Sequence, residues 1–251
     1  MRTSKDVGFK TSRISPDHYF RWRIKRCVNP VEKINNIRKL KNSTVLDIGC
    51  GFGALSYTLH SYGANVYATE VDIKKINRAK FFLKGKDISL IRVVDEKLPF
   101  NNLFFDVIFI FDVIEHVYDP DKLLREIYRT LKPGGYAYVE FTPYYSVVGH
   151  HLYDYSKWPI HIFPRRMIKR YILSQGNKGF LTAHDLWNQY LSLNKLKISN
   201  FQKMISSFQT INERFIVKIP EVFELNVPFL KYVPMKDFIT MSYEGIFRKP
   251  V

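Results

Sequence analysis

The sequence has few of the features that mark a secreted or membrane-spanning chain. Only two of its 251 residues are cysteines, Cys27 and Cys50, too few for a disulfide framework or a cysteine-based metal site. No apolar run is long enough to cross a membrane, because the most apolar segment, Leu103–Ile114, is interrupted by Asp106 and Asp112. The N-terminus lacks an apolar signal region. These absences predict a cytoplasmic protein without a transmembrane segment.

Acidic side chains are scarce at both ends of the chain. The whole sequence has 39 Lys and Arg against 23 Asp and Glu, which gives a formal net charge of +16. Residues 1–42 contribute +9 and residues 144–251 contribute +8, whereas residues 43–143 are nearly neutral at −1. Basic flanks of this kind either keep a surface soluble or attract an anionic partner such as a phosphorylated substrate, a membrane surface or nucleic acid.

What is present is centred on the stretch Thr44–Ala54. Thr44–Ile48 is a short apolar run with one acid, Asp47, which predicts a buried strand of a parallel sheet. Three glycines at alternate positions follow, and residues 54–62 carry apolar side chains at helical spacing. A strand, a glycine turn and a helix together form a ligand cradle, because the backbone N–H groups face the ligand. On this stretch alone, G-x-G-x-x-A also fits a dinucleotide fingerprint, so NAD is an alternative cofactor.

A second acid follows at a spacing that suits a nucleotide ligand. Asn65–Glu70 is predicted as a strand, and Glu70 stands at its carboxyl end, 23 residues after Asp47 and near the spacing at which nucleotide-binding folds place an acid. A carboxylate at this place can accept hydrogen bonds from both ribose hydroxyls. Asp72 competes for the same role, but we interpret it as the N-cap of a helix over residues 73–83.

Further motifs follow in a fixed order. They are a strand over residues 88–94, the loop Leu98-Pro-Phe100, an apolar strand Phe105–Phe111, the pair Glu115-His116, a helix capped by Asp119, the turn Leu131-Lys-Pro-Gly-Gly135 and a strand Tyr136–Phe141. With Asp-x-Gly-x-Gly-x-Gly at Asp47–Gly53, residues 43–143 resemble the core of the class I S-adenosylmethionine-dependent methyltransferases, in particular the group that methylates small molecules. A dehydrogenase has no reason to show these motifs in this order, which disfavours NAD.

The resemblance implies S-adenosyl-L-methionine as cofactor and a set of residues that contact it. In the family an acid before the Leu-Pro-Phe loop reaches the adenine; here the usual position is Val94, so either Asp95 or Glu96 serves, and the choice stays open. The implied cofactor-binding residues are Asp47, Gly49, Cys50, Gly51, Gly53, Glu70, Val71, Asp95, Glu96 and Asp112.

The segment after Phe141 is rich in aromatic and histidine side chains and is predicted to be an acceptor lid. It contains Tyr144, Tyr145, His150, His151, Tyr153, Asp154, Tyr155, Trp158 and His161. Candidate catalytic residues are His116, His150, His151 and Tyr145, since a histidine can exchange protons near neutral pH. A metal site built from His150, His151, Asp154 and His161 is conceivable, but adjacent histidines suit one ion poorly and methyl transfer needs no metal, so none is expected.

We therefore predict an α/β, Rossmann-like fold with a seven-stranded, mostly parallel sheet, helices on both faces and an antiparallel last strand. Residues 1–42 are expected to form a basic arm and a helix that begins at Pro30, and residues 43–143 the cofactor core. Residues 144–197 are expected to form the insert, with helices at 164–174 and 184–190. Residues 198–251 complete the sheet with a helix and strands at 209–217 and 238–247.

The predicted activity is methyl transfer to an O, N or C atom of a small-molecule or lipid-like acceptor that can be anionic. The alternative is an RNA or protein methyltransferase that uses the basic flanks, and a binding module that keeps the fold is disfavoured by the intact glycine turn and Glu70. Nucleic acid is an open but disfavoured partner, and peripheral membrane contact is compatible with the charge. The sequence does not indicate the acceptor or the oligomeric state.

Overall fold

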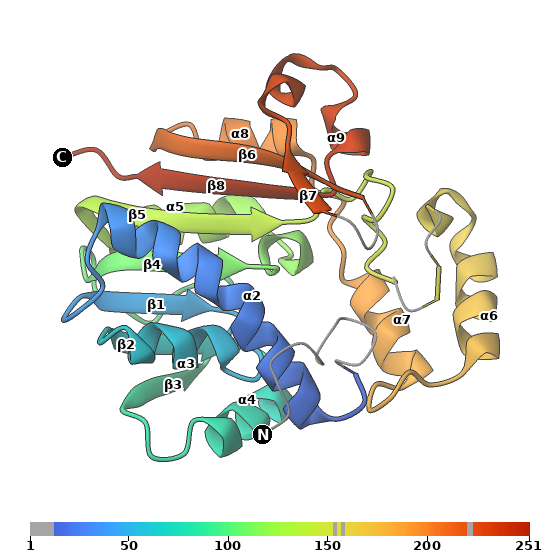
Figure 1. Ribbon diagram of the computed structural model, residues 1–251, viewed down its shortest axis with the longest axis horizontal. Coiled ribbons are helices and arrows are strands. Elements are labelled where there is room, and N and C mark those ends of the chain that lie inside the picture. Colours follow the sequence, from blue (N-terminus) through green and yellow to red (C-terminus); the bar gives the residue numbers. More distant parts are fainter. Residues whose placement is uncertain (1–12, 153–154, 157–158, 220–222) are drawn as a thin grey trace.

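The computed structural model describes residues 13–152, 155–156, 159–219 and 223–251. Its centre is one twisted sheet in the order β3-β2-β1-β4-β5-β8-β6-β7 (Figure 1). The strands are β1 Thr44–Ile48, β2 Asn65–Glu70, β3 Ile88–Arg92, β4 Phe105–Phe111, β5 Leu131–Phe141, β6 Gln209–Ile219, β7 Phe223–Asn226 and β8 Ser242–Arg248. The first five are parallel, whereas β8 is antiparallel to both β5 and β6. The predicted fold class and the antiparallel strand beside β5 are confirmed.

The described sheet has eight strands, so the predicted count of seven is wrong. The additional strand is β7, a four-residue segment that pairs antiparallel with the end of β6. A strand this short, read as Phe-Glu-Leu-Asn, has too few positions to show a clear alternation of apolar and polar side chains. It pairs with the last residues of β6, Ile216–Ile219, most of which lie beyond the pairing of β6 with β8, and local sequence does not reveal this extension.

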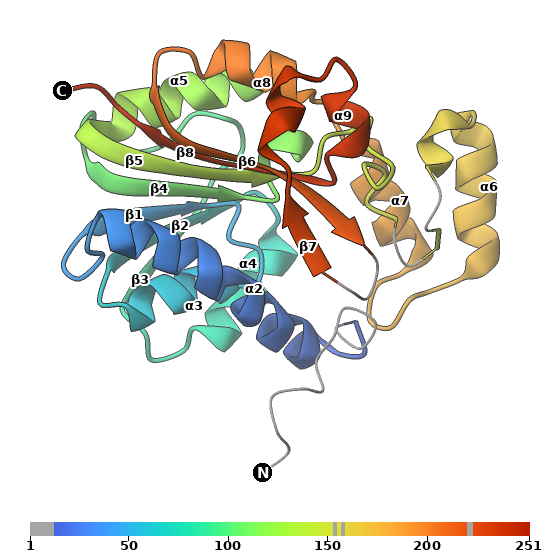
Figure 2. The same ribbon diagram turned by 45° about the horizontal axis from the view of Figure 1, so that its top comes forward.

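Helices cover both faces of the sheet (Figure 2). On one face lie α2 (Pro16–Ile37) and α3 (Ala54–Ser61), whose apolar side chains pack with those of β1 and β4. On the other face lie α5 (Pro120–Thr130) and α8 (Ile198–Met204). The helix α4 (Ile73–Phe82) follows β2, with Asp72 as its N-cap as predicted. β4 is buried along its whole length because both faces are covered.

The helix α2 corrects a predicted boundary, because it begins at Pro16 and continues unbroken through Pro30. Ser15 caps the start, its side chain accepting a hydrogen bond from His18 N, and Pro16 occupies the first turn, where its missing N–H costs nothing. Pro30 lacks the N–H for one helical hydrogen bond. It lies on the buried face of α2, whose packing outweighs that loss. None of the described helices is both long and apolar enough to cross a membrane.

The insert forms a small lobe beside the carboxyl ends of the parallel strands (Figures 1 and 2). It carries the short helix η2 (Ile160–Ile162), α6 (Arg165–Gln175) and α7 (Ala183–Leu191), with an apolar cluster of its own. Tyr144 and Leu152 belong to this cluster, which shows that part of the aromatic segment packs as a satellite core. Of the aromatic and acidic residues expected there, Tyr153, Asp154 and Trp158 lie outside the described residues.

Two element boundaries differ from expectation in the second half of the chain. β5 begins at Leu131, so the Lys-Pro-Gly-Gly turn forms the irregular start of this strand, where its register against β4 shifts. Residues 236–239 are helical (α9, Lys236–Ile239) after the short helix η3 (Pro228–Tyr232), so the last strand starts at Ser242 and not at Phe238. Neither difference changes the order of the sheet.

Candidate active site

A cavity of about 2260 Å³ lies at the carboxyl ends of β1, β2 and β4. Its walls come from the glycine turn, the loops after β2, β3 and β4, the N-terminal half of α2 and the insert. Ligand pockets usually have volumes of about 300–1,000 Å³. This cavity is therefore large enough to hold a nucleoside cofactor and a second molecule together.

The glycine turn forms one wall of the cavity. Gly49, Gly51 and Gly53 all have positive φ, at 68°, 58° and 85°, a region that residues with a Cβ rarely adopt. A Cβ at Gly49 would lie 2.5 Å from the Val113 side chain, so the loop after β4 packs directly on the turn. A Cβ at Gly51 would meet no atom within 4 Å, because this glycine faces open space. The turn therefore offers bare backbone to a ligand, as a cofactor cradle requires.

Asp47 links the strand before the glycine turn to the helix after it. It is buried, and one carboxylate oxygen accepts a hydrogen bond from the Ser56 hydroxyl of α3 at 2.6 Å. Burial raises the pKa of Asp47 to about 7, although the Ser56 hydrogen bond and Arg23 act in the opposite direction. The predicted cofactor residue Cys50 is also buried, and its thiol pKa is raised by the same cause. Both residues line the cavity.

Glu70 joins the end of β2 to the glycine turn. One carboxylate oxygen accepts from Gly51 N at 3.0 Å, and the other accepts from Val71 N and Asp72 N at 2.9 and 3.1 Å. The side chain thereby holds the turn in place and lines the cavity together with Val71. Asp72 instead accepts from Lys74 N at 2.8 Å and caps α4, which confirms its predicted structural role.

Asp95 and Glu96 both line the cavity after β3, so the structure does not choose between them as the adenine acid. Glu96 accepts from Asp119 N at 3.2 Å, and Asp95 accepts from Lys97 N at 2.8 Å. Lys122 lies within 4 Å of both carboxylates. The site of an adenine amino group remains a prediction for either acid.

Two arginines of α2 that sequence reasoning missed reach into the cavity. Arg23 and Arg26 donate to the same carboxylate oxygen of Asp112, at 2.6 and 2.9 Å. Both guanidinium groups also lie over the Phe111 ring, 4.7 and 4.8 Å from its centre. Burial alone would raise the pKa of Asp112, but the two arginines lower it below its usual value. The sequence signal that could have indicated these arginines is the helix start at Ser15-Pro16. A helix that starts there places residues 23 and 26 on one face of α2.

Aromatic rings connect the parts of the chain that cover the glycine turn. Tyr19 of α2 lies 5.4 Å from the Phe52 ring in the turn and 5.9 Å from the Phe180 ring of the insert. Phe52 and Phe180 lie 6.0 Å apart. Phe180 N donates to the Arg13 carbonyl oxygen at 3.0 Å, which links the insert to the segment before α2. The insert thus contacts the glycine-turn end of the cavity through Phe180.

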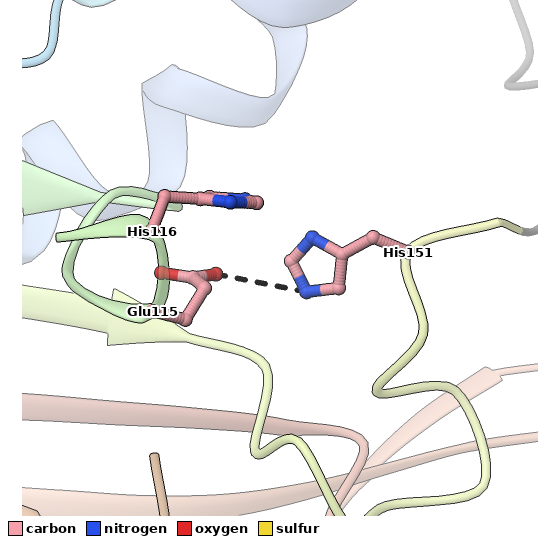
Figure 3. Close-up of side chains that lie close together, drawn as sticks. All are labelled: Glu115, His116 and His151. Carbon is pink, nitrogen blue, oxygen red and sulfur yellow. Dashed lines mark ion pairs between the residues drawn. The ribbon is translucent and has the colours of Figure 1, made fainter. Parts of the chain in front are cut away.

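The loop after β4 and the insert bring three polar side chains together (Figure 3). Glu115 and His116 belong to the short helix η1 (Ile114–His116), and His151 comes from the insert. His151 Nε2 lies 3.8 Å from a Glu115 carboxylate oxygen, and the two histidine rings lie 5.1 Å apart. Burial raises the pKa of Glu115 well above its usual value and lowers those of His116 and His151 to about 4 and about 3. At neutral pH both histidines are therefore uncharged.

Hydrogen bonds from the segment after α7 fix this cluster. Ser192 donates its hydroxyl proton to the Gln189 carbonyl at 2.8 Å, so it accepts the 2.7 Å hydrogen bond from His116 Nδ1. The proton of neutral His116 is then on Nδ1, and Nε2 keeps its lone pair. Asn194 donates to the carbonyl oxygens of Ile114 and Val117, and its N–H to that of Glu115. This segment clamps η1 at three points.

The structure separates the four predicted catalytic residues into two pairs. His116 and His151 line the cavity, whereas His150 and Tyr145 are not among its lining residues. His150 is fully buried, accepts from Leu152 N at 2.9 Å and lies 5.9 Å from the His161 ring. Tyr145 is 40% exposed, with Lys197 over its ring. Two adjacent histidines in a sequence do not reveal that His151 faces the cavity and His150 faces away from it.

The core of the chain is similar in sequence to known proteins. Residues 46–139 match the family described as "Methyltransferase domain". Ubiquinone biosynthesis O-methyltransferases from Pelagibacter ubique and Caulobacter vibrioides are 34% and 39% identical over 103 and 99 residues, covering 41% and 38% of this chain. The matches span 43% and 39% of those two proteins, so the similarity is limited to less than half of each relative.

Solved structures resemble the chain over almost its whole length. An S-adenosylmethionine-dependent methyltransferase from Mesorhizobium loti has a TM-score of 0.57 at 17% identity, covering 93% of this chain and 100% of that one. A protein from Pyrococcus horikoshii has a TM-score of 0.57 at 18% identity, with 95% of each chain covered. At these identities the likeness concerns the fold.

Residues 46–139 therefore form a methyltransferase domain, and the chain has the fold of solved S-adenosylmethionine-dependent methyltransferases. The sequence-based recognition of this class is confirmed. The two similar enzymes are named as O-methyltransferases. His151 and the arginines of α2 lie outside residues 46–139, the stretch that the family matches.

Replacing Glu70 with Ala is expected to weaken binding of S-adenosylhomocysteine by about 1.5–3 kcal/mol, the range for a hydrogen bond to a charged group. The matched control, Asp72→Ala, removes only the cap of α4 and should lower the free energy of unfolding by about 1 kcal/mol with affinity changed by less than a few-fold. Calorimetry and urea unfolding on both variants measure these effects. The reverse pattern would show that Asp72 and not Glu70 holds the ribose.

The raised pKa of Asp47 predicts a pH-dependent stability of the cofactor-free protein. Its carboxyl group stays protonated in the folded state up to about pH 7, but ionises near pH 4 when unfolded, so it stabilises the fold at low pH and this contribution disappears as pH rises through 7. Between pH 5 and 8 the wild type should lose about 2 kcal/mol more unfolding free energy than Asp47→Asn, whose amide oxygen still accepts from Ser56. The unfolding free energy of each protein is measured with urea at several pH values. An equal change of that free energy with pH in both proteins would refute this prediction.

Proposed function

We propose that this protein transfers a methyl group from S-adenosylmethionine to a hydroxyl oxygen of a small molecule. The observation that carries the proposal is one continuous cavity, which runs from the glycine turn and Glu70 to His116 and His151, with Glu115 buried behind them. One end has the backbone cradle and acids that suit a nucleoside, and the other has uncharged polar groups that suit an acceptor. The names of the curated relatives support oxygen as the acceptor atom.

The residues on hand suit the chemistry of a sulfonium methyl donor. S-adenosylmethionine supplies an activated methyl group when bound, so the protein has to position the acceptor in line and exclude water. Gly51 offers open backbone space for the cofactor, and Tyr19 and Phe52 shield the turn beside it. Because the positive charge of a sulfonium disappears during transfer, a water-poor site lined by aromatic side chains favours the reaction.

The walls of the cavity favour an acceptor with an apolar body and a negative group. Arg23 and Arg26 place two positive charges beside Asp112, and Arg26 also donates to Glu140 at 3.4 Å, so this wall offers cationic groups to a ligand. The acceptor side is otherwise mostly apolar. Its apolar lining residues include Val113, Val147, Val148, Phe238, Ile239 and Met241. A lipid-like or phenolic anion would satisfy both features.

The alternative acceptor is RNA or protein, and it has one observation in its favour. The helix α6 exposes four basic side chains to solvent, namely Arg165, Arg166, Lys169 and Arg170. A basic helix can contact phosphates in a salt-dependent way. The cavity is the stronger guide because α6 contributes none of its lining residues.

The test is methyl transfer from labelled S-adenosylmethionine into a lysate separated into small molecules, lipids, nucleic acid and protein. We expect label in the small-molecule or lipid fraction, and much less label with Glu70→Ala at a cofactor concentration near the wild-type Kd. Calorimetry should show binding of S-adenosylhomocysteine and not of NAD. Label in the nucleic acid or protein fraction alone would contradict the proposal and support the alternative.

A further inference from the structure

Three potential metal ligands converge at the acceptor end of the cavity (Figure 3). Glu115, His116 and His151 each place one oxygen or nitrogen atom within 4.8 Å of those of the other two. Ligands at about 2.1 Å from one ion lie roughly 3–3.4 Å apart. The 3.8 Å separation between His151 Nε2 and the Glu115 carboxylate is close to that value. Small rotations of the side chains would bring all three atoms within bonding distance of one ion.

Glu115 provides an independent indication of an absent partner. The side chain is only 1% exposed, and its Oε1 atom accepts a long hydrogen bond of 3.4 Å from Thr142 N. Its Oε2 atom is buried and has no hydrogen-bond partner in the described part of the chain. A buried oxygen left without a partner costs about 1–3 kcal/mol of stability. A cation beside Glu115 would satisfy this oxygen.

His116 is oriented as a ligating histidine is. Metal-bound histidines almost always donate their second ring N–H to a neighbouring acceptor, which fixes the ring and its tautomer. Here Nδ1–H donates to Ser192 Oγ at 2.7 Å, because the Ser192 hydroxyl is already the donor to Gln189. The lone pair of Nε2 is therefore available to the cluster. A histidine prepared in this way belongs to a built site and not to a chance grouping of side chains.

We propose that Glu115, His116 and His151 bind one divalent transition-metal ion. Two imidazole nitrogens and one carboxylate are a donor set for Zn²⁺, Mn²⁺, Fe²⁺ or Co²⁺, whereas Mg²⁺ prefers oxygen ligands and water. Three protein ligands leave coordination positions open towards the cavity. This inference departs from the expectation of a metal-free site based on sequence, since residues 115–116 and 151 are brought together only by the fold.

The open positions suggest a role that rests on the proposed methyl transfer. An acceptor hydroxyl bound there would be acidified, as water is on a catalytic zinc ion. Its O–H bond breaks and the proton passes to solvent water. The oxygen then forms the new C–O bond as the S–C bond of the sulfonium breaks, which leaves S-adenosylhomocysteine. The atoms and charges balance without any further reactant.

The experiment titrates the EDTA-treated full-length protein with Zn²⁺, Mn²⁺ and Co²⁺ separately, by calorimetry and by the visible absorption of Co²⁺. One ion per chain should bind, and Glu115→Gln and His151→Gln should each weaken binding at least tenfold. Ser192→Ala, which changes no ligand, should weaken it about 10- to 100-fold by releasing the His116 ring. The exposed His184→Gln is the matched control and should bind like the wild type.

The outcomes separate this proposal from the proposed function. Binding of S-adenosylhomocysteine is measured on the same samples, together with circular dichroism to confirm that each variant is folded. Ion binding that all three variants weaken supports the metal site even if no lysate fraction accepts a methyl group. A folded wild type that binds none of the three ions at 1 mM overturns it. So does binding that is unchanged in both Glu115→Gln and Ser192→Ala.

Discussion

Asp112 has a left-handed backbone conformation, φ 57°, at the point where the buried strand β4 ends. Such a conformation is uncommon for a residue with a side chain, and it persists only where the surroundings over-determine it. Here β4 is held by strands on both sides, and two arginines of α2 hold the Asp112 carboxylate. After the turn at Asp112, Val113 and His116 line the cavity, whereas Glu115 is buried beside it. The acceptor end depends on this one change of direction.

Charge in this region is arranged for a water-poor site. Arg23 and Arg26 compensate Asp112 and stack on Phe111, whereas Glu115 and the two histidines are biased towards their uncharged forms by burial. The overall positive charge of the chain says little about this arrangement, because it counts surface lysines equally with buried arginines. What matters locally is the pairing of Arg23 and Arg26 with Asp112 and of Arg26 with Glu140.

The cofactor side was largely predictable from sequence, and the acceptor side was not. Asp47, the glycine turn and Glu70 belong to short local patterns, in which a strand, a turn and a helix follow one another with little freedom. The acceptor side depends on contacts between distant segments, such as Arg23 with Asp112 and His151 with Glu115. No spacing rule connects those positions. Similarly, Pro30 suggested a helix start, and only the packing of α2 on the sheet shows that it is internal.

Asn194 ties the insert to the loop after β4, and that loop in turn packs on the glycine turn. The Asn194 side chain and backbone donate to two carbonyl groups of η1 and to that of Val117 just after it, while Val113, just before η1, fills the space against Gly49 of the glycine turn. The segment after α7, the loop after β4 and the glycine turn are therefore joined by direct contacts. Residues of all three line the cavity, so its two ends share one continuous wall.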